Sequence, residues 1–543
     1  MPSALGQNTL QTDRNSSASS LSPSWIHFAL PSVTDLIFIL VLVLLSYSVL
    51  SARLLGDAGI GWHIRNGELM LRMHTVTRAD PFSYTMSGRP WLAWEWLYDL
   101  IIGAIHKWVG LNGVVFFTAI VIALTFALTF HIRLARGGLL PISLILLLLA
   151  IGASMIHFLA RPHVLSWLFT VIWFQLLDSA EVAPENRRRL TWLPLLMLFW
   201  VNLHGGFLFG LALLGLYWLA GMIRYLQTGT EGRRAVAAWV KQLSAVGALS
   251  FLATFANPYG YKLHAHIYRY LTNRFLMNHI DEFRSPDFHG IAQECFAVLL
   301  VIAIVALAAA RGKIRASQLL VILFASYSGL YASRNLPVAS ILLILVAGPL
   351  FSAAVRDAGN NAELPDRTRN FLSQCSSFAL RMGNLEQSLR GHLWPVAAVT
   401  FGLFVCTQHG RVASHKLMNA HFDETKFPVA ATQLIAERSI HEPIFSLDSW
   451  GGYFIYRLYP EMKVFVDDRH DLYGEQFLRE YLTAIRLAPG WDQVLDGKRV
   501  NWVLMPGDST LANMLKETHR WRIIYADDVA VLLEREEGVA RPT

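Results

Sequence analysis

Long apolar stretches recur through the first three quarters of the chain and stop near Cys406. Each holds roughly 20 residues, the length that an α-helix needs to cross a bilayer. We predict about eleven such helices, centred near residues 43, 122, 149, 171, 197, 215, 248, 301, 325, 345 and 400. The pattern is typical of a polytopic α-helical membrane protein.

The two ends of the chain depart from this pattern. Residues 1–30 are rich in Ser, Asn and Gln and predict a disordered tail. Residues 31–408 form the predicted transmembrane domain. In residues 409–543, β-rich runs such as EPIFSL, GGYFIYRLYP and KVFVDDRHDLYG alternate with helical segments, which predicts a C-terminal α/β domain.

Composition agrees with a membrane protein. Hydrophobic residues make up 54% of the 543 positions and charged residues only 16%, and the mean hydropathy is +0.39. A soluble enzyme of this size would need far more charge. The net charge of +7 suits contact with anionic lipids, and no nucleic-acid partner is expected. The three cysteines predict neither a disulfide framework nor a zinc site.

Short basic loops fall on alternate sides of the predicted spans. They include HIRLARGG, ENRRRL, the Arg233 and Arg234 stretch, and ARGKIR. The positive-inside rule places them in the cytoplasm. With an odd number of spans, the N-terminus is cytoplasmic and the C-terminal domain is extracytoplasmic.

The polar motifs fall on the opposite, extracytoplasmic side. They are residues 57–95, ARPH at 160–163, NLHGG at 202–206, the stretch 256–290, and SRNLP at 333–337. Any one of them could simply cap a helix or sit among headgroups. Five on one face favour function, because ionisable groups near membrane depth are costly.

The first extracytoplasmic loop, residues 56–110, holds two helix-like pieces rich in Trp that suit the membrane interface. Asp57 at the membrane edge is a candidate general base, or else an N-cap. Glu95 between two tryptophans is a second candidate, or else a partner of Arg65 or Arg161. His63 and His204 could bind a divalent metal with Asp57, although no compact ligand spacing is present.

Arginines in the other polar motifs are candidates for holding a phosphate, because a guanidinium matches phosphate oxygens in pairs. Headgroup salt bridges are the alternative role. The candidates are Arg161, Arg274, Arg284 and Arg334, with Tyr259 and Lys262 able to share the task and Asn202 and His204 as further site candidates. In the C-terminal domain, Asp467, Asp468 and Asp471 could contact sugar hydroxyls or an acceptor, or instead cap a helix and pair with Arg469.

An acidic residue in the first loop, two interfacial helices behind it, many spans and an extracytoplasmic C-terminal domain resemble the GT-C superfamily of polyprenyl-phosphate-dependent glycosyltransferases. The subgroup it resembles is that of protein mannosyltransferases and lipid A aminoarabinose transferases. The resemblance implies a bacterial inner-membrane enzyme of cell-envelope glycan synthesis, with Asp57 as base or acceptor-positioning residue. Relatives commonly carry two adjacent acids here, whereas Ala58 follows Asp57 in this chain.

If the resemblance holds, the chain transfers a sugar from an isoprenoid phosphate or diphosphate to a glycan, lipid or protein acceptor outside the cytoplasm. Arg334, with Arg161 or Lys262, would neutralise the leaving phosphate. No nucleotide-binding fingerprint is present. A transporter or flippase and a non-catalytic envelope scaffold remain the alternatives, although transporters usually carry internal repeats that this chain lacks.

Overall fold

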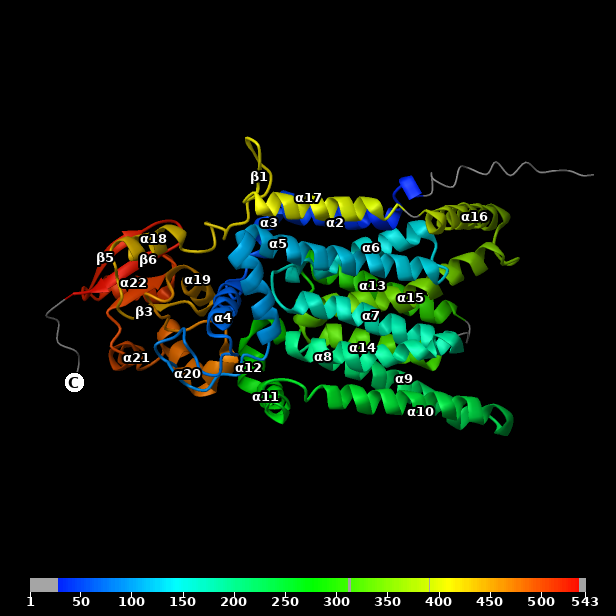
Figure 1. Cartoon of the computed structure of the whole chain (residues 1–543), viewed down its shortest axis with the longest axis horizontal. Coiled ribbons are helices and arrows are strands. Elements are labelled where there is room, and N and C mark those ends of the chain that lie inside the picture. Colours follow the sequence, from blue (N-terminus) through cyan, green and yellow to red (C-terminus); the bar gives the residue numbers. More distant parts are fainter. Residues whose placement is uncertain (1–27, 311–313, 390, 537–543) are drawn as a thin grey trace, which may run out of the picture.

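This computed structural model describes residues 28–310, 314–389 and 391–536 of the chain. A bundle of roughly parallel helices makes up most of it, and a smaller part built of helices and strands covers one end of the bundle (Figure 1). Most of the predicted N-terminal tail, and Arg311 and Lys313 of one basic loop, lie outside the described residues.

The bundle contains a helix at each of the predicted centres within the described residues. They are α2 (Val33–Tyr47), α5 (Trp96–Ala135), α6 (Leu140–Ser154), α7 (His163–Val182), α8 (Trp192–Leu203), α9 (Phe207–Gln227), α10 (Thr230–Ala253), α13 (Ile291–Ala309), α14 (Ala316–Tyr331), α15 (Leu336–Gly359) and α17 (Leu393–Thr407). Further helices join them, most of them short: α3 (Leu50–Leu54), η1 (Met155–His157), η2 (Pro184–Thr191), α11 (Tyr261–Thr272), α12 (Arg274–His279), η3 (Asp281–Phe283), η4 (Ser333–Asn335) and the longer α16 (Asp366–Ser388).

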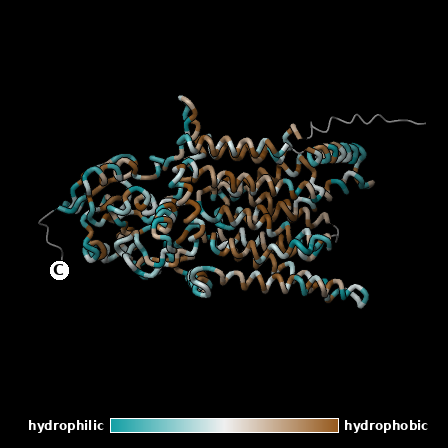
Figure 2. Tube along the Cα trace, viewed as in Figure 1, coloured by the Kyte–Doolittle hydropathy of each residue, from teal (hydrophilic) through white to brown (hydrophobic). Residues whose placement is uncertain are grey.

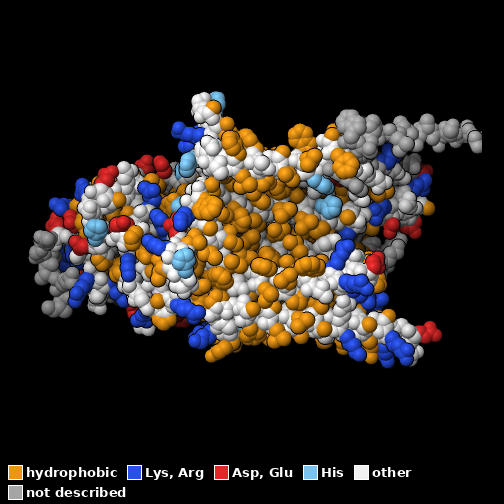
Figure 3. All heavy atoms as spheres, viewed as in Figure 1, with side chains coloured by type: hydrophobic (Ala, Val, Ile, Leu, Met, Phe, Trp, Pro, Cys, Tyr) orange, Lys and Arg blue, Asp and Glu red, His pale blue; other side chains and the backbone are white. Residues whose placement is uncertain are grey.

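Six helices of the described residues are long and apolar enough to cross a membrane, or up to seven if the bent pair α16 and α17 counts as one span. The helices α2 and α14 are apolar but shorter. The predicted number of eleven spans therefore stays a prediction. Hydrophobic residues run along the bundle (Figure 2), and apolar side chains form a broad band on the face seen in Figure 3, with Lys and Arg at its margins. The chain is a multi-pass membrane protein.

Helices form at both predicted pieces of the first loop: α4 (Ile60–Met73) and the beginning of α5. Gly110, at φ 68°, bends α5 and separates this first part from the apolar remainder. Gly67 of α4 and Gly103 of α5 face each other so closely that a Cβ on either would collide with the other helix backbone. The close approach fixes α4 against α5.

The part at the end of the bundle contains a four-stranded mixed sheet in the order β3-β4-β6-β5. Strands β3 (Ile444–Ser446) and β4 (Trp502–Met505) are parallel, and β6 (Val531–Arg535) runs antiparallel to β4 and to β5 (Trp521–Ala526). The helices around the sheet are α18 (Val429–Glu437), α19 (Asp448–Leu458), α20 (His470–Ile485), α21 (Trp491–Gly497) and α22 (Thr510–Glu517). A small hairpin, β1 (Arg411–Val412) and β2 (His415–Lys416), follows α17.

Two β-rich runs of the sequence take other forms. GGYFIYRLYP was predicted as extended but lies in α19, because Gly452 must pack against the backbone of Ala58 and Gly61 against that of Gly452. Within KVFVDD, Val464 makes a single parallel bridge to Ser83 of the first loop rather than joining the sheet. The first loop and the C-terminal part are therefore packed directly on each other.

Candidate functional site

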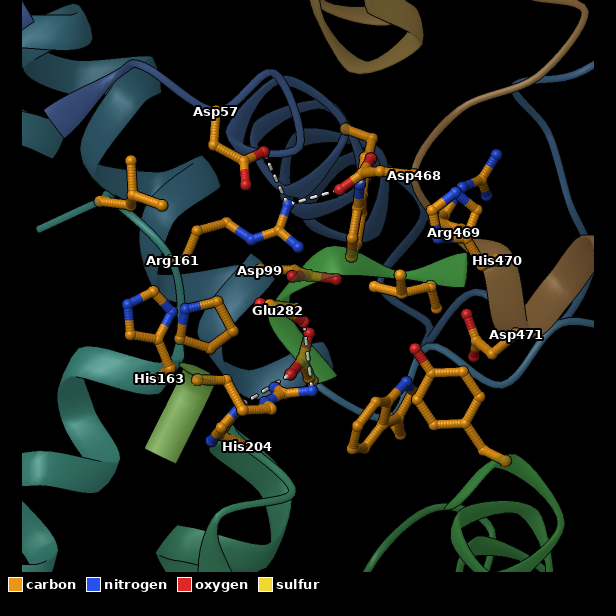
Figure 4. Close-up of a pocket in the computed structure, with 18 of the residues that line it drawn as sticks. Asp57, Asp99, Arg161, His163, His204, Glu282, Asp468, Arg469, His470 and Asp471 are labelled. Atoms are coloured by element: carbon orange, nitrogen blue, oxygen red, sulfur yellow. Dashed lines mark hydrogen bonds and ion pairs between the residues drawn. The ribbon is translucent and has the colours of Figure 1, made fainter. Parts of the chain in front are cut away.

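A cavity of about 450 Å³ lies where the bundle, the first loop and the C-terminal part meet. Figure 4 shows acidic and basic side chains from all three converging on it. Its charged and imidazole side chains are Asp57, Glu95, Asp99, His157, Arg161, His163, His204, Asp281, Glu282, Arg334, Asp468, Arg469, His470 and Asp471. Trp62, Trp91, Trp94 and Tyr270 add aromatic walls. Polar motifs far apart in the sequence therefore share one cavity.

Arg161, just before α7, stands between two carboxylates. Its Nη1 lies 2.7 Å from Asp468 Oδ2 and 3.2 Å from Asp57 Oδ1. Burial lowers the pKa of this guanidinium, but Asp57 and Asp468 outweigh it and hold the pKa well above the ordinary value. Asp57 also accepts a hydrogen bond from the Gly59 N–H at 2.7 Å, but Gly59 itself is the N-cap of α4, so the alternative role of Asp57 as an N-cap is wrong. Arg161 is therefore a fixed positive charge.

Arg334 of η4 enters the cavity from a different segment. Its Nη1 lies 3.2 Å from Glu282 Oε1, and its guanidinium stands 4.4 Å from the ring centroid of Phe283. Burial raises the pKa of Glu282, but Arg334 together with His157, Arg161 and His204 outweighs burial, so the pKa lies below its ordinary value. Arg334 and Glu282 thus form an ion pair on the wall of the cavity.

Glu95, at the residue before α5, is only 9% exposed. Its Oε1 lies 3.7 Å from His204 Nε2 and its Oε2 lies 3.9 Å from His63 Nε2. Burial raises the pKa of Glu95 to about 8, although Arg161 and Arg334 act in the opposite direction. A carboxyl group with a pKa near neutrality can accept or donate a proton in catalysis. Arg65, one of the two partners considered in the alternative role for Glu95, instead binds Glu68 at 2.8 Å and the backbone carbonyl of Tyr456.

His63 lies behind Glu95 and is fully buried. Its Nδ1 is 2.5 Å from Asp99 Oδ1, and Asn66 Nδ2 donates to Asp99 Oδ2 at 2.6 Å. Trp62 stacks on the imidazole with 3.6 Å between ring centroids. Burial, and then the charge of Arg161, lower the pKa of His63 well below its ordinary value, so the ring is neutral at pH 7.

The segment 467–471 closes the far side of the cavity. Arg469 is buried, is held by two hydrogen bonds to Asp467 at 2.7 and 2.8 Å, and lies 2.8 Å from Asp80 of the first loop. Asp471 lies 2.9 Å from His266 Nε2. The alternative role considered for Asp467, pairing with Arg469, is therefore the one observed, whereas Asp468 and Asp471 face the cavity.

Some predicted site residues do not line the cavity. Tyr259 braces the first loop, since its hydroxyl accepts from Ala93 N at 3.0 Å and donates to Thr77 O at 3.1 Å. Asn202 accepts from Trp96 Nε1 at 2.8 Å and donates to two backbone carbonyls. Lys262 is exposed on α11.

Arg284 is also outside the cavity. Its side chain is 64% exposed and lies 3.4 Å from Asp281. Its neighbour in sequence, Phe283, is the residue that packs inward. Arg284 therefore pairs locally on the surface and does not join Arg161 and Arg334.

The suggested metal ligands are not assembled. His63 is turned toward Asp99, while Asp57 is paired with Arg161. Among the described residues, no group of three or more His, Cys, Asp or Glu side chains is arranged to hold a metal ion.

Comparison with known protein families gave no match, and no curated protein matches in sequence. Solved structures do match. The apo oligosaccharyltransferase of Archaeoglobus fulgidus aligns with a TM-score of 0.53 and 11% identity over 89% of this chain and 70% of its own. The chain has the GT-C fold.

Two further structures that match the chain were solved with lipid phosphates. The archaeal oligosaccharyltransferase AglB from Archaeoglobus fulgidus, in complex with an inhibitory peptide and a dolichol-phosphate, aligns with a TM-score of 0.51 and 11% identity over 87% of this chain and 69% of its own. ArnT from Cupriavidus metallidurans, bound to undecaprenyl phosphate, aligns with a TM-score of 0.48 and 13% identity over 94% and 98%. At 11% identity the likeness to AglB shows the fold alone.

Within this GT-C fold, the cavity contains residues that the sequence did not single out. Glu282 pairs with a predicted phosphate ligand, and Asp99 holds His63. Asp99 stands in WLYDLIIGAIH, where apolar residues at helical spacing surround one carboxylate. A carboxylate on the apolar side of a helix is buried and therefore needs a partner. This pattern could have identified Asp99 as a candidate site residue from the sequence.

Proposed function

We propose that the chain is a glycosyltransferase that moves a sugar from a polyprenyl phosphate or diphosphate to an acceptor on the extracytoplasmic face of the bacterial inner membrane. The observation that carries this proposal is the convergence of Arg161, Arg334 and Glu95 on one cavity at the end of a membrane bundle. Two guanidinium groups suit the phosphate of a donor, and a carboxyl group with a pKa of about 8 suits proton transfer.

The orientation belongs to the proposal. The basic loops lie in the cytoplasm by the positive-inside rule, the spans number about eleven, and the cavity with the domain of residues 409–543 faces outward. Sugar nucleotides would then be absent from the side where transfer occurs. A lipid-linked sugar can serve as the donor there, since its headgroup can be presented at the outer leaflet.

In the proposed reaction, the acceptor hydroxyl attacks the anomeric carbon of the donor sugar. The bond between that carbon and the donor phosphate oxygen breaks, and its electron pair stays on the phosphate. Arg334 and Arg161 stabilise the charge that develops there, and such electrostatic stabilisation often dominates catalysis. Glu95 takes the proton of the acceptor hydroxyl.

Asp57 takes a different role from the one that its position in the sequence favoured. It lies 3.2 Å from Arg161 and accepts a backbone hydrogen bond, so we assign it to orienting Arg161. Glu95 is the better base, because burial raises its pKa to about 8, and in its ionised form it accepts a proton more readily than an ordinary carboxylate. Arg161 is shared by Asp57 and Asp468 in the free protein, so a donor phosphate must compete with these carboxylates.

The test is capture of the donor lipid. The full chain is purified in nanodiscs with its native lipids, and the retained lipids are identified by mass spectrometry. We expect an isoprenoid phosphate to be enriched in the native protein and lost in the double variant Arg161→Ala, Arg334→Ala. A native protein without isoprenoid phosphate, or a pore through the bilayer in a cryo-EM map, would overturn the proposal in favour of a scaffold or a transporter.

A further inference from the structure

A second cavity, of about 430 Å³, lies at the other end of the helix bundle from the site described above. The helix α7 connects the two cavities: it begins beside the first, at His163, and its C-terminal half, from Phe174 on, lines the second. A helix of 20 residues is about 30 Å long, so the two cavities are separate. The lining of the second cavity comes from α5, α7, η2, α14 and α15.

Asp178 of α7 joins two arginines in this second cavity. Nη1 of Arg136 lies 2.9 Å from Asp178 Oδ2, and Nη2 of Arg315 lies 2.8 Å from Asp178 Oδ1. The hydroxyl of Tyr217 also donates to Oδ1, at 3.0 Å. Asp178 is only 3% exposed. Both of its oxygens are therefore engaged, and each holds one guanidinium group at the cavity.

Two glutamines stand beside these arginines. Nη2 of Arg136 donates to Gln175 Oε1 at 2.7 Å, and the backbone N–H of Arg315 donates to Gln318 Oε1 at 3.0 Å. Because these nitrogens can only donate, the atom that each one meets in the amide must be the oxygen. Each glutamine keeps its Nε2 group, which is a donor. Among the described residues, neither Nε2 group is paired with an acceptor.

The polar side of the cavity is therefore rich in donors. A guanidinium group has five N–H groups. The side chain of Arg136 uses two of them in the contacts above, and that of Arg315 uses one for Asp178 and one for Glu181. The other N–H groups and the two glutamine amides need acceptors, whereas both oxygens of Asp178 are occupied. A ligand that fits brings several oxygen acceptors together, as a phosphate does.

The remaining walls of the cavity are apolar. Val182, at the end of α7, is 63% exposed, so apolar surface continues from the cavity to the outside of the bundle. A soluble phosphate compound gains nothing from such walls, whereas the glycerol and acyl chains of a lipid bury apolar area against them. The apolar lining residues are Ile132, Ala135, Val182, Ala183, Leu345, Val346 and Pro349.

The surroundings favour a headgroup with a net negative charge. The two arginines of the cavity are balanced by two carboxylates. An excess of positive charge comes from η2, which supplies Asn186 to the cavity and continues with Arg187, Arg188 and Arg189. Figure 3 shows Lys and Arg side chains gathered at this end of the bundle. Basic pockets between membrane helices bind anionic headgroups.

We propose that the second cavity binds an anionic phospholipid of the membrane. Its phosphate accepts from Arg136 and Arg315, and its glycerol and acyl chains lie along the apolar walls. This lipid is not the sugar donor, and its site is separate from the cavity in which we place sugar transfer. The bound lipid joins α5, α7, α14 and α15 at one point, and it stabilises the folded protein by mass action.

The experiment uses the full chain in phosphatidylcholine nanodiscs in which the proportion of phosphatidylglycerol is raised stepwise. Native mass spectrometry counts the phosphatidylglycerol retained by the protein, and thermal unfolding measures the stabilisation. The first variant is Arg136→Met. The second is Gln175→Met, which keeps both ion pairs of Asp178 and covers the case in which Arg136→Met does not fold.

Arg233 offers a matched control for Arg136. Its guanidinium stands 5.2 Å from the ring centroid of Tyr225, as that of Arg136 stands 4.8 Å from the ring centroid of Phe174. Arg233 lies at the start of α10, is exposed, and does not line the cavity. Arg233→Ala therefore removes a basic side chain without touching the proposed site.

We expect Arg136→Met to weaken phosphatidylglycerol binding about 10-fold or more, the scale of one lost charge-assisted hydrogen bond, and Gln175→Met to weaken it several-fold. Arg233→Ala should retain as much lipid as the native protein and show the same thermal shift. Unchanged retention in the folded variants of the cavity overturns the site. An equal loss in Arg233→Ala also overturns it, because basic residues would then attract the lipid without a defined site.

Two further measurements identify the source of the phosphate. Glycerol phosphate is added to nanodiscs that lack phosphatidylglycerol, and undecaprenyl phosphate is added to nanodiscs that contain it. We expect no thermal shift from the first and no displacement of phosphatidylglycerol by the second. A shift by glycerol phosphate that is lost in Arg136→Met would assign the site to a soluble phosphate, and displacement would assign it to an isoprenoid. Either result overturns the phospholipid.

Discussion

Arg161 and Asp468 lie 2.7 Å apart, although 307 positions separate them in the sequence. One precedes a helix of the membrane bundle, and the other belongs to the C-terminal part. The contact joins the two parts at the cavity (Figure 4). It also means that the carboxylate of Asp468 is bound to Arg161, the residue that we assign to binding the donor phosphate.

Replacing Asp468 tests this competition. In Asp468→Asn the side chain can no longer pair with Arg161 as an anion, so we expect undecaprenyl phosphate to bind several-fold more tightly. The folded state should lose about 1 kcal/mol, roughly the difference between a charge-assisted hydrogen bond and the neutral one that the amide can still accept. Lipid titration and thermal unfolding measure the two effects, with the exposed Asp508→Asn as control. Weaker lipid binding in Asp468→Asn would contradict the competition.

Arg334 should contribute directly to lipid phosphate affinity. We expect Arg334→Ala to weaken undecaprenyl phosphate binding by about 10- to 100-fold, since a charge-assisted hydrogen bond contributes about 1.5–3 kcal/mol. Arg334→Lys should retain only part of the affinity for undecaprenyl phosphate, because an ammonium group cannot bind two phosphate oxygens in the way a guanidinium does.

Arg479 offers a matched control for Arg334. It also pairs with a glutamate, Glu475, at 2.6 Å, and stands 4.1 Å from the ring centroid of Phe275, but it lies outside the cavity. Arg479→Ala should bind lipid as the native protein does. Equal losses in the two variants would mean that Arg334 stabilises the fold rather than a phosphate.

The pKa of Glu95 predicts how stability depends on pH. The folded protein holds its proton up to a pH of about 8, whereas the ordinary pKa is 4.5. Between these values the folded state binds more protons than the unfolded state, so stability falls as pH rises. Glu95→Gln has no titrating group at this position, so its stability should decrease less as the pH rises.

Thermal unfolding in nanodiscs across that pH range measures the slope. The exposed Glu461→Gln serves as control and should keep the native slope. If Glu95→Gln and the native protein show parallel curves, the pKa of Glu95 is not raised, and its assignment as the base loses its support.

Asn202 is expected to affect stability rather than lipid binding. Its amide makes three hydrogen bonds, to Trp96 and to the carbonyls of Leu198 and Ala256, at 2.7–2.9 Å. Asn202→Ala leaves these groups unpaired and should cost about 1–3 kcal/mol. Thermal unfolding should therefore occur at lower temperature, with unchanged affinity for undecaprenyl phosphate in the folded fraction. A stable variant that fails to bind lipid would return Asn202 to the site.

The sequence predicted the positions of the bundle helices well, because apolar stretches of membrane length are a strong signal. It misread GGYFIYRLYP as extended. Aromatic and β-branched residues favour strands only weakly, and here close packing of Gly452 against Ala58 decides in favour of a helix. Such a contact between residues about four hundred positions apart leaves no mark in the local pattern.

The sequence indicated that the polar motifs act together, but it did not show which of their side chains line the cavity. NLHGG supplies His204 to the cavity while Asn202 turns away, and FRSPDF carries Arg284 on the surface. Spacing alone does not say which neighbour points inward when the backbone is irregular. The sequence offered Asp468 either as a contact for sugar hydroxyls or an acceptor, or as a cap and a partner of Arg469. Its observed partner, Arg161, could be found only in three dimensions.

The segment 467–471 that completes the cavity follows every helix of the bundle in the chain. During synthesis the bundle therefore leaves the ribosome first, with Arg161 and Asp80 still lacking their partners Asp468 and Arg469. The wall is finished only when the end of the chain has been translated and has reached the same side of the membrane. A chain that ends before this segment lacks one wall of the cavity, so the site can form only after the last part of the protein has been made.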